Sequence, residues 1–306
     1  MDLYRTPDDQ FANLPDFPWE PSYAEVTLPD GESGTPLRMA YIDAGPADGP
    51  VALLLHGEPT WSFLYRHVID ALVQAGVRCI APDLVGFGRS DKPLATADHT
   101  YARHVEWVRE LAFDRLDLQD VTLVGQDWGG LIGLRLAAEN PERFAKIVAA
   151  NTGLPTGDHR MPDIWWGFRE AVEKAEVLQV GRFVESGCVR GMSTEVREAY
   201  DAPFPVEESK AGPRVMPSLV PNTPDDPASD ANRAAWAQLT QWEKPFLTPF
   251  SDSDPITGAM APILRKLVPG TRGLEHPVVT NAGHFLQEDA GTELGHIVAE
   301  FVTGAP

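Results

Sequence analysis

The stretch VTLVGQDWGGL, residues 121–131, decides the fold that we expect for this chain. Its first four residues are apolar or β-branched and predict a buried strand, while the residues after Asp127 begin a helical pattern. Gly125 and Gly129 flank Asp127, so the turn between strand and helix reads Gly-x-Asp-x-Gly. In such a tight turn no side chain fits beside the central residue. That residue is held in strained backbone geometry and projects into a cleft at the carboxyl edge of the sheet.

A carboxylate at the centre of this turn predicts a particular chemistry. A serine that attacked saturated carbon would form an ether, which water does not readily cleave, whereas a carboxylate forms an ester that an activated water can hydrolyse. Asp127 therefore predicts substitution at an alkyl carbon followed by ester hydrolysis. The alternative is that Asp127 merely caps the helix beginning at Trp128, because Asp is a common N-cap residue. The two flanking glycines and the preceding strand favour the nucleophile.

Apolar strands alternate with amphipathic helices around this turn, which is typical of a parallel sheet covered on both faces. We expect strands at residues 51–55, 78–81, 121–124 and 145–150, and helices at residues 61–75, 100–116 and 130–139. The alternation stops after Asn151. It resumes with an expected strand at 245–250, a helix at 259–267, a strand at 276–280 and a final helix at 292–302.

The segment between the two strand series is helical in pattern, is interrupted by prolines and contains no clear buried strand. A strand series interrupted by one helical block predicts an α/β core with an inserted lid. We expect residues 1–153 to form the first part of the core, residues 154–235 a helical cap, and residues 236–306 the second part of the core.

Composition excludes several classes of function. The 306 residues include 25 Lys and Arg against 45 Asp and Glu, a net charge of −20, which disfavours binding to nucleic acid or to anionic membranes. No apolar run approaches the roughly 20 residues that cross a bilayer, and the start MDLYRTPDDQ lacks the layout of a signal peptide. Only Cys79 and Cys188 are present, which argues against a disulfide framework or a cysteine metal site and favours the cytoplasm.

A base and a supporting acid are expected further along the chain. His284 follows the last predicted strand, and the order Asp127, later acid, His284 matches the order nucleophile, acid, base of such sheets. Asp252 and Asp254 both follow the strand at 245–250. We favour Asp254, 30 residues before His284, as the group that fixes the imidazole tautomer and offsets its charge, whereas Asp252 better fits a solvated turn.

The loop HGEPTW, residues 56–61, follows the first strong strand and is expected to supply an oxyanion donor. In this architecture one backbone N–H comes from that loop and a second from the residue after the nucleophile, which indicates Glu58 and Trp128. The Glu58 side chain could also hold a water. The indole N–H of Trp128 is a pure donor that suits a departing halide. A second such donor is expected from the lid pair Trp165 and Trp166. We prefer Trp166, although Trp165 would be the donor if the rotation of the helix turned that residue toward the cleft.

These residues together carry a family likeness. The motifs HGEPTWSFLYR (56–66), APDLVGFGRSDKP (81–93), VGQDWGG (124–130) and NAGHF (281–285) resemble those of haloalkane dehalogenases in the α/β-hydrolase superfamily. The resemblance is to the subgroup that places its acid after the seventh core strand and binds halide with two tryptophans. It implies an α/β-hydrolase fold, in which a mostly parallel eight-stranded sheet is flanked by helices and carries an inserted helical cap.

The resemblance also implies an activity. It assigns Asp127 as nucleophile, His284 as base and Asp254 as acid, with the halide held by Trp128 and one of the Trp165–Trp166 pair. The expected reaction converts a haloalkane to a primary alcohol, a halide ion and a proton, without a metal or an organic cofactor. We expect a monomer that binds a small halogenated alkane.

The main alternative function is epoxide hydrolysis, which uses the same fold and the same Asp nucleophile. It needs a pair of lid tyrosines to protonate the opening epoxide oxygen, and residues 154–235 contain only Tyr200. A serine esterase is excluded because no Gly-x-Ser-x-Gly occurs. A ligand receptor that had lost its activity would be expected to have lost members of the triad, and here all three are present.

Overall fold

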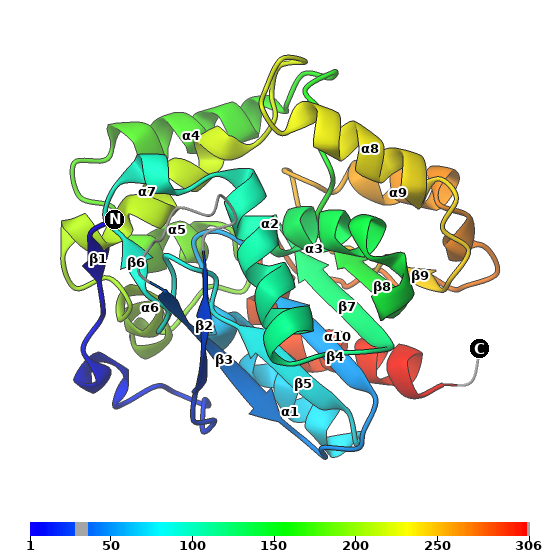
Figure 1. The fold of residues 1–306 in the computed structure, drawn as a ribbon, viewed down its shortest axis with the longest axis horizontal. Coiled ribbons are helices and arrows are strands. Elements are labelled where there is room, and N and C mark those ends of the chain that lie inside the picture. The colour runs from blue at the N-terminus through cyan, green and yellow to red at the C-terminus, as the bar shows by residue number, and fades with distance from the viewer. Residues whose placement is uncertain (28–35, 305–306) are drawn as a thin grey trace.

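The computed structural model describes residues 1–27 and 36–304, and its centre is a twisted sheet of seven strands (Figure 1). The strand order is β2-β3-β5-β4-β7-β8-β9. The pairs β2–β3 and β3–β5 are antiparallel, and every pair from β5 to β9 is parallel. The strands of the sheet are β2 (Ser22–Val26), β3 (Leu37–Ala44), β4 (Val51–Leu55), β5 (Arg78–Pro82), β7 (Val121–Gln126), β8 (Phe144–Ala150) and β9 (Phe246–Leu247). A separate pair, β1 (Leu3–Tyr4) and β6 (Lys92–Pro93), is antiparallel.

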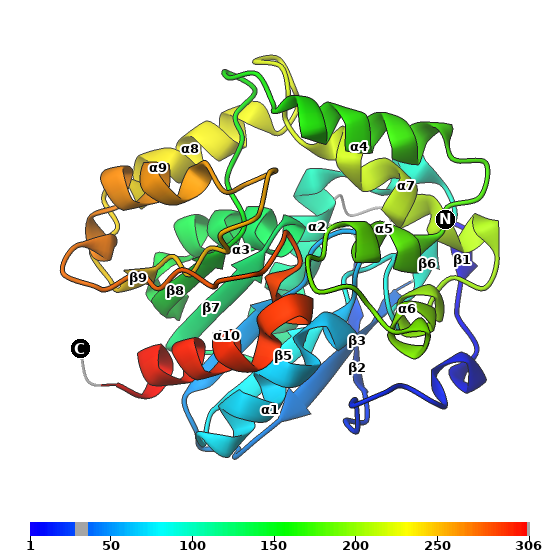
Figure 2. The same ribbon diagram turned by 180° about the vertical axis from the view of Figure 1, so that it is seen from behind.

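Helices cover both faces of the sheet, as the continuous apolar strands predict. On one face α1 (Arg66–Gln74) packs against α10 (Leu286–Thr303), which lies in front of the sheet in Figure 2. On the other face α3 (Trp128–Glu139) packs against both α2 (Tyr101–Arg109) and α8 (Ser229–Leu239). The strand β7 is buried along its whole length between these layers. Among the described residues, no helix has the length and apolar character needed to span a bilayer.

The predicted α/β-hydrolase fold is confirmed, but the sheet has seven strands in the described residues where eight were expected. The strand predicted at 276–280 is reduced to a single parallel bridge between Ser251 and Val279, and the one predicted at 245–250 forms only over Phe246–Leu247. Proline lacks the N–H that a ladder requires, and Pro249 and Pro277 stand inside the two predicted strands. The antiparallel strands β2 and β3 were not among the ranges predicted from the sequence.

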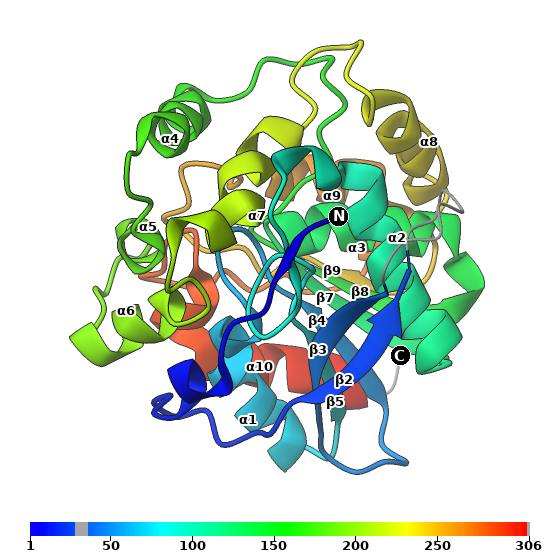
Figure 3. The same ribbon diagram turned by 60° about the vertical axis from the view of Figure 1, so that its left-hand side comes forward.

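The chain between β8 and β9 is helical, as expected. It contains α4 (Asp163–Lys174), α5 (Val180–Ser186), α6 (Thr194–Asp201), α7 (Ala211–Val215) and α8, and Figure 3 shows α4 standing well away from the sheet. The boundary expected at residue 235 falls inside α8, which packs on the core helix α3. After β9 the chain forms α9 (Met260–Leu267) and a short 3-10 helix (Pro269–Thr271) before the loop that leads to α10.

Candidate active site

The sharp turn predicted at residues 125–129 is present between β7 and α3. Asp127 has φ 50° and ψ −125°, in the left-handed half of backbone space that non-glycine residues rarely adopt, and α3 begins at the next residue. A Cβ on Gly129 would lie 1.8 Å from the carbonyl oxygen of Leu55, and a Cβ on Gly125 would lie 2.8 Å from the carbonyl oxygen of Gly129. The two glycines are therefore required by close backbone contacts on both sides of Asp127.

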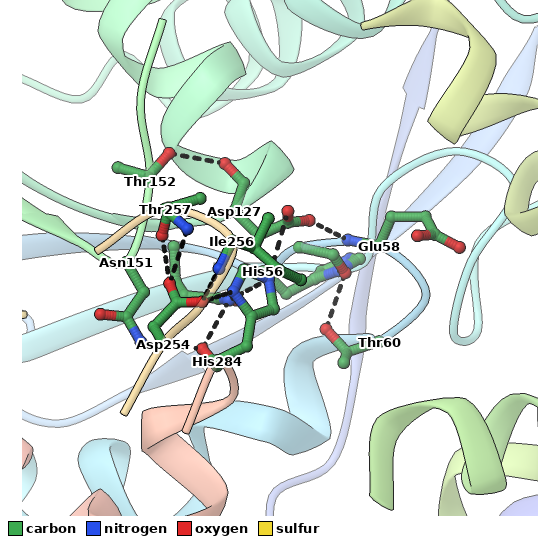
Figure 4. A network of polar contacts seen from close by, with 12 residues as sticks. His56, Glu58, Thr60, Asp127, Asn151, Thr152, Asp254, Ile256, Thr257 and His284 are labelled. Carbon is green, nitrogen blue, oxygen red and sulfur yellow. Dashed lines mark hydrogen bonds and ion pairs between the residues drawn. The ribbon is translucent and has the colours of Figure 1, made fainter. Parts of the chain in front are cut away.

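Asp127, His284 and Asp254 lie in one line, although they come from three separate loops (Figure 4). The Oδ2 atom of Asp127 is 3.4 Å from Nε2 of His284. The Nδ1 atom of His284 is 3.1 Å from Oδ1 of Asp254. Asp252, the other candidate acid, is exposed and accepts a hydrogen bond from the amide of Asn281 at 2.9 Å. The structure thus brings together the three side chains that the sequence favours.

The surroundings of Asp254 favour its charged form. Its side chain is fully buried. Its carboxylate accepts hydrogen bonds from the backbone N–H of Ile256 at 2.9 Å, from that of Thr257 at 3.2 Å, and from the Thr257 hydroxyl. Burial alone would raise the pKa of Asp254, but the charge and hydrogen bond of His284, together with the bonds from Thr257 and Ile256, lower the pKa below its usual value.

Several groups shift the pKa of His284 in opposite directions, and their net effect favours the imidazolium cation. Burial lowers the pKa of the imidazole, whereas the charge of Asp254 and the hydrogen bonds and charge of the two carboxylates raise it, and the result is a pKa of about 10. In this state, with Asp127 ionised, His284 carries the proton at neutral pH. Any event that removes the charge of Asp127 must lower that pKa.

Glu58 contacts the candidate nucleophile through its main chain. Its backbone N–H donates to Oδ1 of Asp127 at 2.8 Å, while the backbone N–H of Trp128 makes no hydrogen bond to that carboxylate in the part of the chain that the structure describes. The Glu58 side chain is buried, and its Oε1 has no hydrogen-bond partner among the described residues. Burial, and then the nearby charge of Asp127, hold the pKa of this carboxyl well above its usual value, which favours the neutral acid.

A cavity of about 970 Å³ opens over Asp127, His284 and Trp128. Its wall is largely apolar and is built mainly by the helical block between β8 and β9 and by the start of α9, including Phe168, Val220, Met260 and Ile263. Trp128 is buried and lines the cavity, and no described residue accepts a hydrogen bond from its indole nitrogen. Apolar walls with a few convergent polar groups are typical of sites for small organic molecules.

The preference for Trp166 as a lid donor does not agree with the structure. Trp165 is buried and lines the cavity, whereas Trp166 is 37% exposed and is not part of the cavity wall. The two rings pack edge to face with centroids 4.7 Å apart. The side of α4 that faces the cavity carries Trp165, Phe168 and Ala171, which have helical spacing, and that phase turns Trp166 outward.

Asn151 is a site residue that sequence reasoning missed. In the sequence it marks only the point at which the alternation of strands and helices stops. Its side-chain amide donates to Ser251 Oγ at 2.8 Å, to the carbonyl of Gly283 at 2.8 Å and to that of His284 at 3.0 Å. It therefore joins the end of β8 to the two loops that carry the acid and the base. Its position at the carboxyl end of the strand next to β7 is the one sequence signal that could have singled it out.

The groups that could act chemically in this site are ionisable side chains. Within residues 1–27 and 36–304, no group of three or more His, Cys, Asp or Glu side chains is placed to hold a metal ion. A carboxylate, an imidazole and a second carboxylate in line are the components of covalent catalysis by a nucleophile, a base and an orienting acid. The single tyrosine of residues 154–235, Tyr200, is fully buried, and its hydroxyl donates to Glu288 and does not line the cavity.

Comparison with known proteins agrees with this geometry. A family model described as the alpha/beta hydrolase fold matches residues 50–291. The haloalkane dehalogenase of Psychrobacter cryohalolentis is 51% identical over 306 residues, which are 100% of each chain. That of Mycolicibacterium paratuberculosis is 52% identical over 294 residues, 96% of each chain.

Solved structures give the same result. The haloalkane dehalogenase of Paraglaciecola agarilytica, described as tetrameric, superposes with a TM-score of 0.89 at 34% identity, over 97% of each chain. That of Bradyrhizobium elkani has a TM-score of 0.76 at 26% identity, over 93% of this chain and 98% of its own. The epoxide hydrolase alternative is not favoured, because these relatives are named as dehalogenases. With its fold, its motifs and its full-length relatives in agreement, the chain belongs to the haloalkane dehalogenases, a family of hydrolases with the α/β-hydrolase fold.

Proposed function

We propose that Asp127, His284 and Asp254 perform the hydrolytic dehalogenation of haloalkanes by way of a covalent ester on Asp127. The alignment of Asp127 Oδ2, the imidazole and Asp254 carries this proposal, with 3.4 Å and 3.1 Å between successive partners. In the first step a carboxylate oxygen of Asp127 attacks the carbon that bears the halogen. A carbon–oxygen bond forms while the carbon–halogen bond breaks, and its electron pair leaves with the halide.

The indole of Trp128 and that of Trp165 are proposed to receive the departing halide. Both rings line the cavity, and neither nitrogen donates to an acceptor among the described residues, so both N–H groups are free to bind an anion. An indole N–H is a neutral donor, so it stabilises the halide without the strong attraction of a cation that would slow product release. The proposal moves the second donor from Trp166 to Trp165.

Hydrolysis of the ester is assigned to His284. Esterification removes the charge of Asp127 and with it one cause of the raised pKa, so His284 releases its proton to solvent and is the neutral imidazole when a base is needed. A water gives a proton to Nε2 as its oxygen bonds to the carboxyl carbon of Asp127. The backbone N–H of Glu58, joined by that of Trp128, stabilises the oxyanion. Collapse breaks the ester bond, and the leaving alkoxide takes the proton from Nε2 and departs as a primary alcohol. The second proton of the water passes from the Asp127 carboxyl to His284, which restores the starting state.

Residues 154–235 are proposed to act as a cap over this chemistry, because much of the cavity wall comes from them. The polar side chain of Glu58 lies within the same cavity and is proposed to hold a water near the ester. Every member of the proposed triad comes from one chain, so we propose that the monomer is active. The Paraglaciecola relative is tetrameric, and sedimentation of this chain together with its activity at low concentration tests the point. Both cysteines are unpaired, which is compatible with the reducing cytoplasm.

The decisive experiment is H284Q with 1-bromobutane. We expect one halide released per active site and an intact protein mass higher by one butyl group in place of a hydrogen, because the ester forms but is not cleaved. D127N is the control and should gain no mass. An unchanged mass for H284Q after prolonged exposure, with wild-type protein turning over, would rule out the covalent route. A response of wild-type protein to styrene oxide without any response to bromoalkanes would favour epoxide hydrolysis.

A further inference from the structure

The loop that carries His284 is fastened to the loop that follows α5. We call residues 187–190 the α5 loop and residues 281–284 the base loop. The backbone N–H of His284 donates to the carbonyl of Gly187 at 2.8 Å. The Arg190 guanidinium donates to the carbonyl of Asn281 at 3.1 Å. A Cβ on Gly283 would lie 2.3 Å from the Gly187 carbonyl oxygen, so the two backbones are in direct contact.

A single buried carboxylate joins these two loops. Asp289, in the first turn of α10, is only 6% exposed. Its Oδ2 accepts from the backbone N–H of Gly283 at 2.8 Å, and its Oδ1 accepts from that of Arg190 at 2.7 Å. The backbone N–H of Val189 donates to both oxygens, at 2.9 and 3.1 Å. Hydrogen bonds to an ionised acceptor are stronger than neutral ones, so this carboxylate is the centre of the contact.

The position of the imidazole depends on this contact. His284 follows Gly283 directly, and its ring has to stay within reach of Asp127 on one side and Asp254 on the other. Gly187, Cys188 and Val189 also line the cavity, so the α5 loop is a substrate wall as well as a support for the base loop. Asp289 itself makes no hydrogen bond to the imidazole and does not line the cavity.

We propose that Asp289 is a positioning residue for His284 and acts by clamping the base loop to the α5 loop. The proposal rests on the function proposed above, in which Asp127 alone forms the ester and His284 is needed only to cleave it. Loss of the clamp must therefore slow ester hydrolysis and spare ester formation. A residue that merely supports folding would instead lower the fraction of active protein and leave the ratio of the two rate constants unchanged.

The test is D289N, with halide release followed by rapid mixing and the ester followed by quenching and intact mass. Asn keeps the size of the side chain but turns one oxygen into an NH₂ group that faces backbone donors. We expect ester formation within about twofold of wild type. We expect hydrolysis to be slower by about tenfold to one-hundredfold, the scale of a misplaced catalytic group. The alkyl-enzyme should accumulate, giving a burst of about one halide per site.

The matched control is E288Q, on the residue before Asp289. The Glu288 side chain is 7% exposed, but its carboxylate accepts from Arg66 and from the Tyr200 hydroxyl at 2.6 Å and makes no hydrogen bond to either loop. We expect E288Q to lower the melting temperature and to leave the ratio of the two rate constants as in wild type. If D289N fails to fold, G283A separates the same two backbones without removing a charge and should also slow hydrolysis selectively.

H284Q, measured in parallel, tests the proposed mechanism separately from the role of Asp289. If H284Q accumulates no ester, the proposed mechanism fails. If H284Q accumulates ester while D289N and G283A keep the wild-type ratio, or slow both steps equally, the assignment of Asp289 is wrong and the mechanism stands. An equal shift of the ratio in E288Q would also overturn it, because general loosening of α10 would then explain the effect.

Discussion

The side-chain amide of Asn151 donates to the carbonyl oxygen of His284 at 3.0 Å, so the loop of the candidate base is held from the end of β8. The same nitrogen reaches the Gly283 carbonyl at 2.8 Å, and the Asn151 Oδ1 accepts from the backbone N–H of Ser251 at 2.9 Å. Asn151 is fully buried and has φ 40°, which Asn tolerates better than most residues. One amide thus connects the strand next to β7 with the base loop and with the loop leading to Asp254.

We predict that N151D lowers both stability and turnover. Asp tolerates the same backbone and has the same shape, but it has no N–H to donate to three buried oxygen acceptors. The new carboxylate oxygen would face these three oxygens with no donor, and a buried polar atom left without a partner costs roughly 1–3 kcal/mol. The free energy of unfolding in urea should therefore fall by about 2 kcal/mol or more, with the rate of halide release also reduced. N222D is the control, because the side-chain amide of half-buried Asn222 donates one hydrogen bond, to the carbonyl of Val220. Equal stability of N151D and wild type would contradict the role given to Asn151.

We predict that W165F weakens halide binding more than W166F does. Trp165 lines the cavity and Trp166 does not, so only the first substitution removes an N–H that can reach the anion. Iodide quenching of tryptophan fluorescence measures the dissociation constant directly. We expect about a tenfold weakening for W165F, the scale of losing one hydrogen bond to a charge, and a change within about twofold for W166F. A larger loss of iodide affinity in W166F than in W165F would assign the second halide donor to Trp166.

Tyr101 is predicted to hold Trp128 in place for the same anion. Its ring packs edge to face against the indole with centroids 4.9 Å apart, and its hydroxyl donates to the Leu131 carbonyl at 2.7 Å. Y101L removes the ring and should weaken iodide binding severalfold. Y101F keeps the ring and should bind iodide nearly as wild type does, with some loss of stability. Identical iodide affinity in Y101L and wild type would show that the indole needs no such support.

The raised pKa of His284 leads to a prediction about pH. Two carboxylates stabilise the cation, so D127N removes one of them and must lower the pKa from about 10. Titration of the imidazole by NMR should show this fall. D252N is the control, because Asp252 is exposed and bonds to the backbone of Asn281 and Ala282 and not to the imidazole. An unchanged or higher pKa in D127N would contradict the cause assigned here.

The same reasoning fixes the pH dependence of ester hydrolysis. The neutral imidazole is the proton acceptor, so the rate constant for hydrolysis rises with pH and levels off above the pKa of His284 in the ester. Since the ester has lost the charge of Asp127, this levelling should occur at a lower pH than the titration of the free enzyme. Single-turnover measurements from pH 5 to 11 test it, and levelling at or above the free-enzyme pKa would be the contrary result.

The centre of the fold could be predicted because local and long-range signals coincide there. The strand β7 is apolar throughout and ends at Gly125, and α3 begins where the glycines allow the chain to turn. The outer strands were harder, because Pro249 and Pro277 interrupt their ladders and only a two-residue pairing and one bridge remain. Sequence pattern reports burial and period, and it does not report how many ladder bonds neighbouring strands will make.

For the candidate site, too, some residues could be predicted from the sequence and others could not. Chain order placed Asp127, a later acid and His284 correctly relative to one another, because the carboxyl ends of parallel strands meet at one edge of the sheet. The sequence could not tell which of Trp165 and Trp166 faces the cavity, because the rotation of α4 about its axis is set by packing against the rest of the molecule. Asn151 and Asp289 were missed because most of their partners are backbone groups, and a hydrogen bond to a backbone group requires no particular residue type at the partner position.

The strands that precede the three triad residues differ in how many hydrogen bonds they make to their neighbours, and this difference predicts how the enzyme responds to heating. Asp127 follows β7, which pairs with β4 through four of its residues and with β8 through all six, whereas Asp254 follows the two-residue β9 and His284 a single bridge. Segments with the fewest ladder bonds open first as temperature rises. Thermal inactivation should therefore precede melting of the central sheet, and enzyme cooled from that interval should recover its turnover without having to refold.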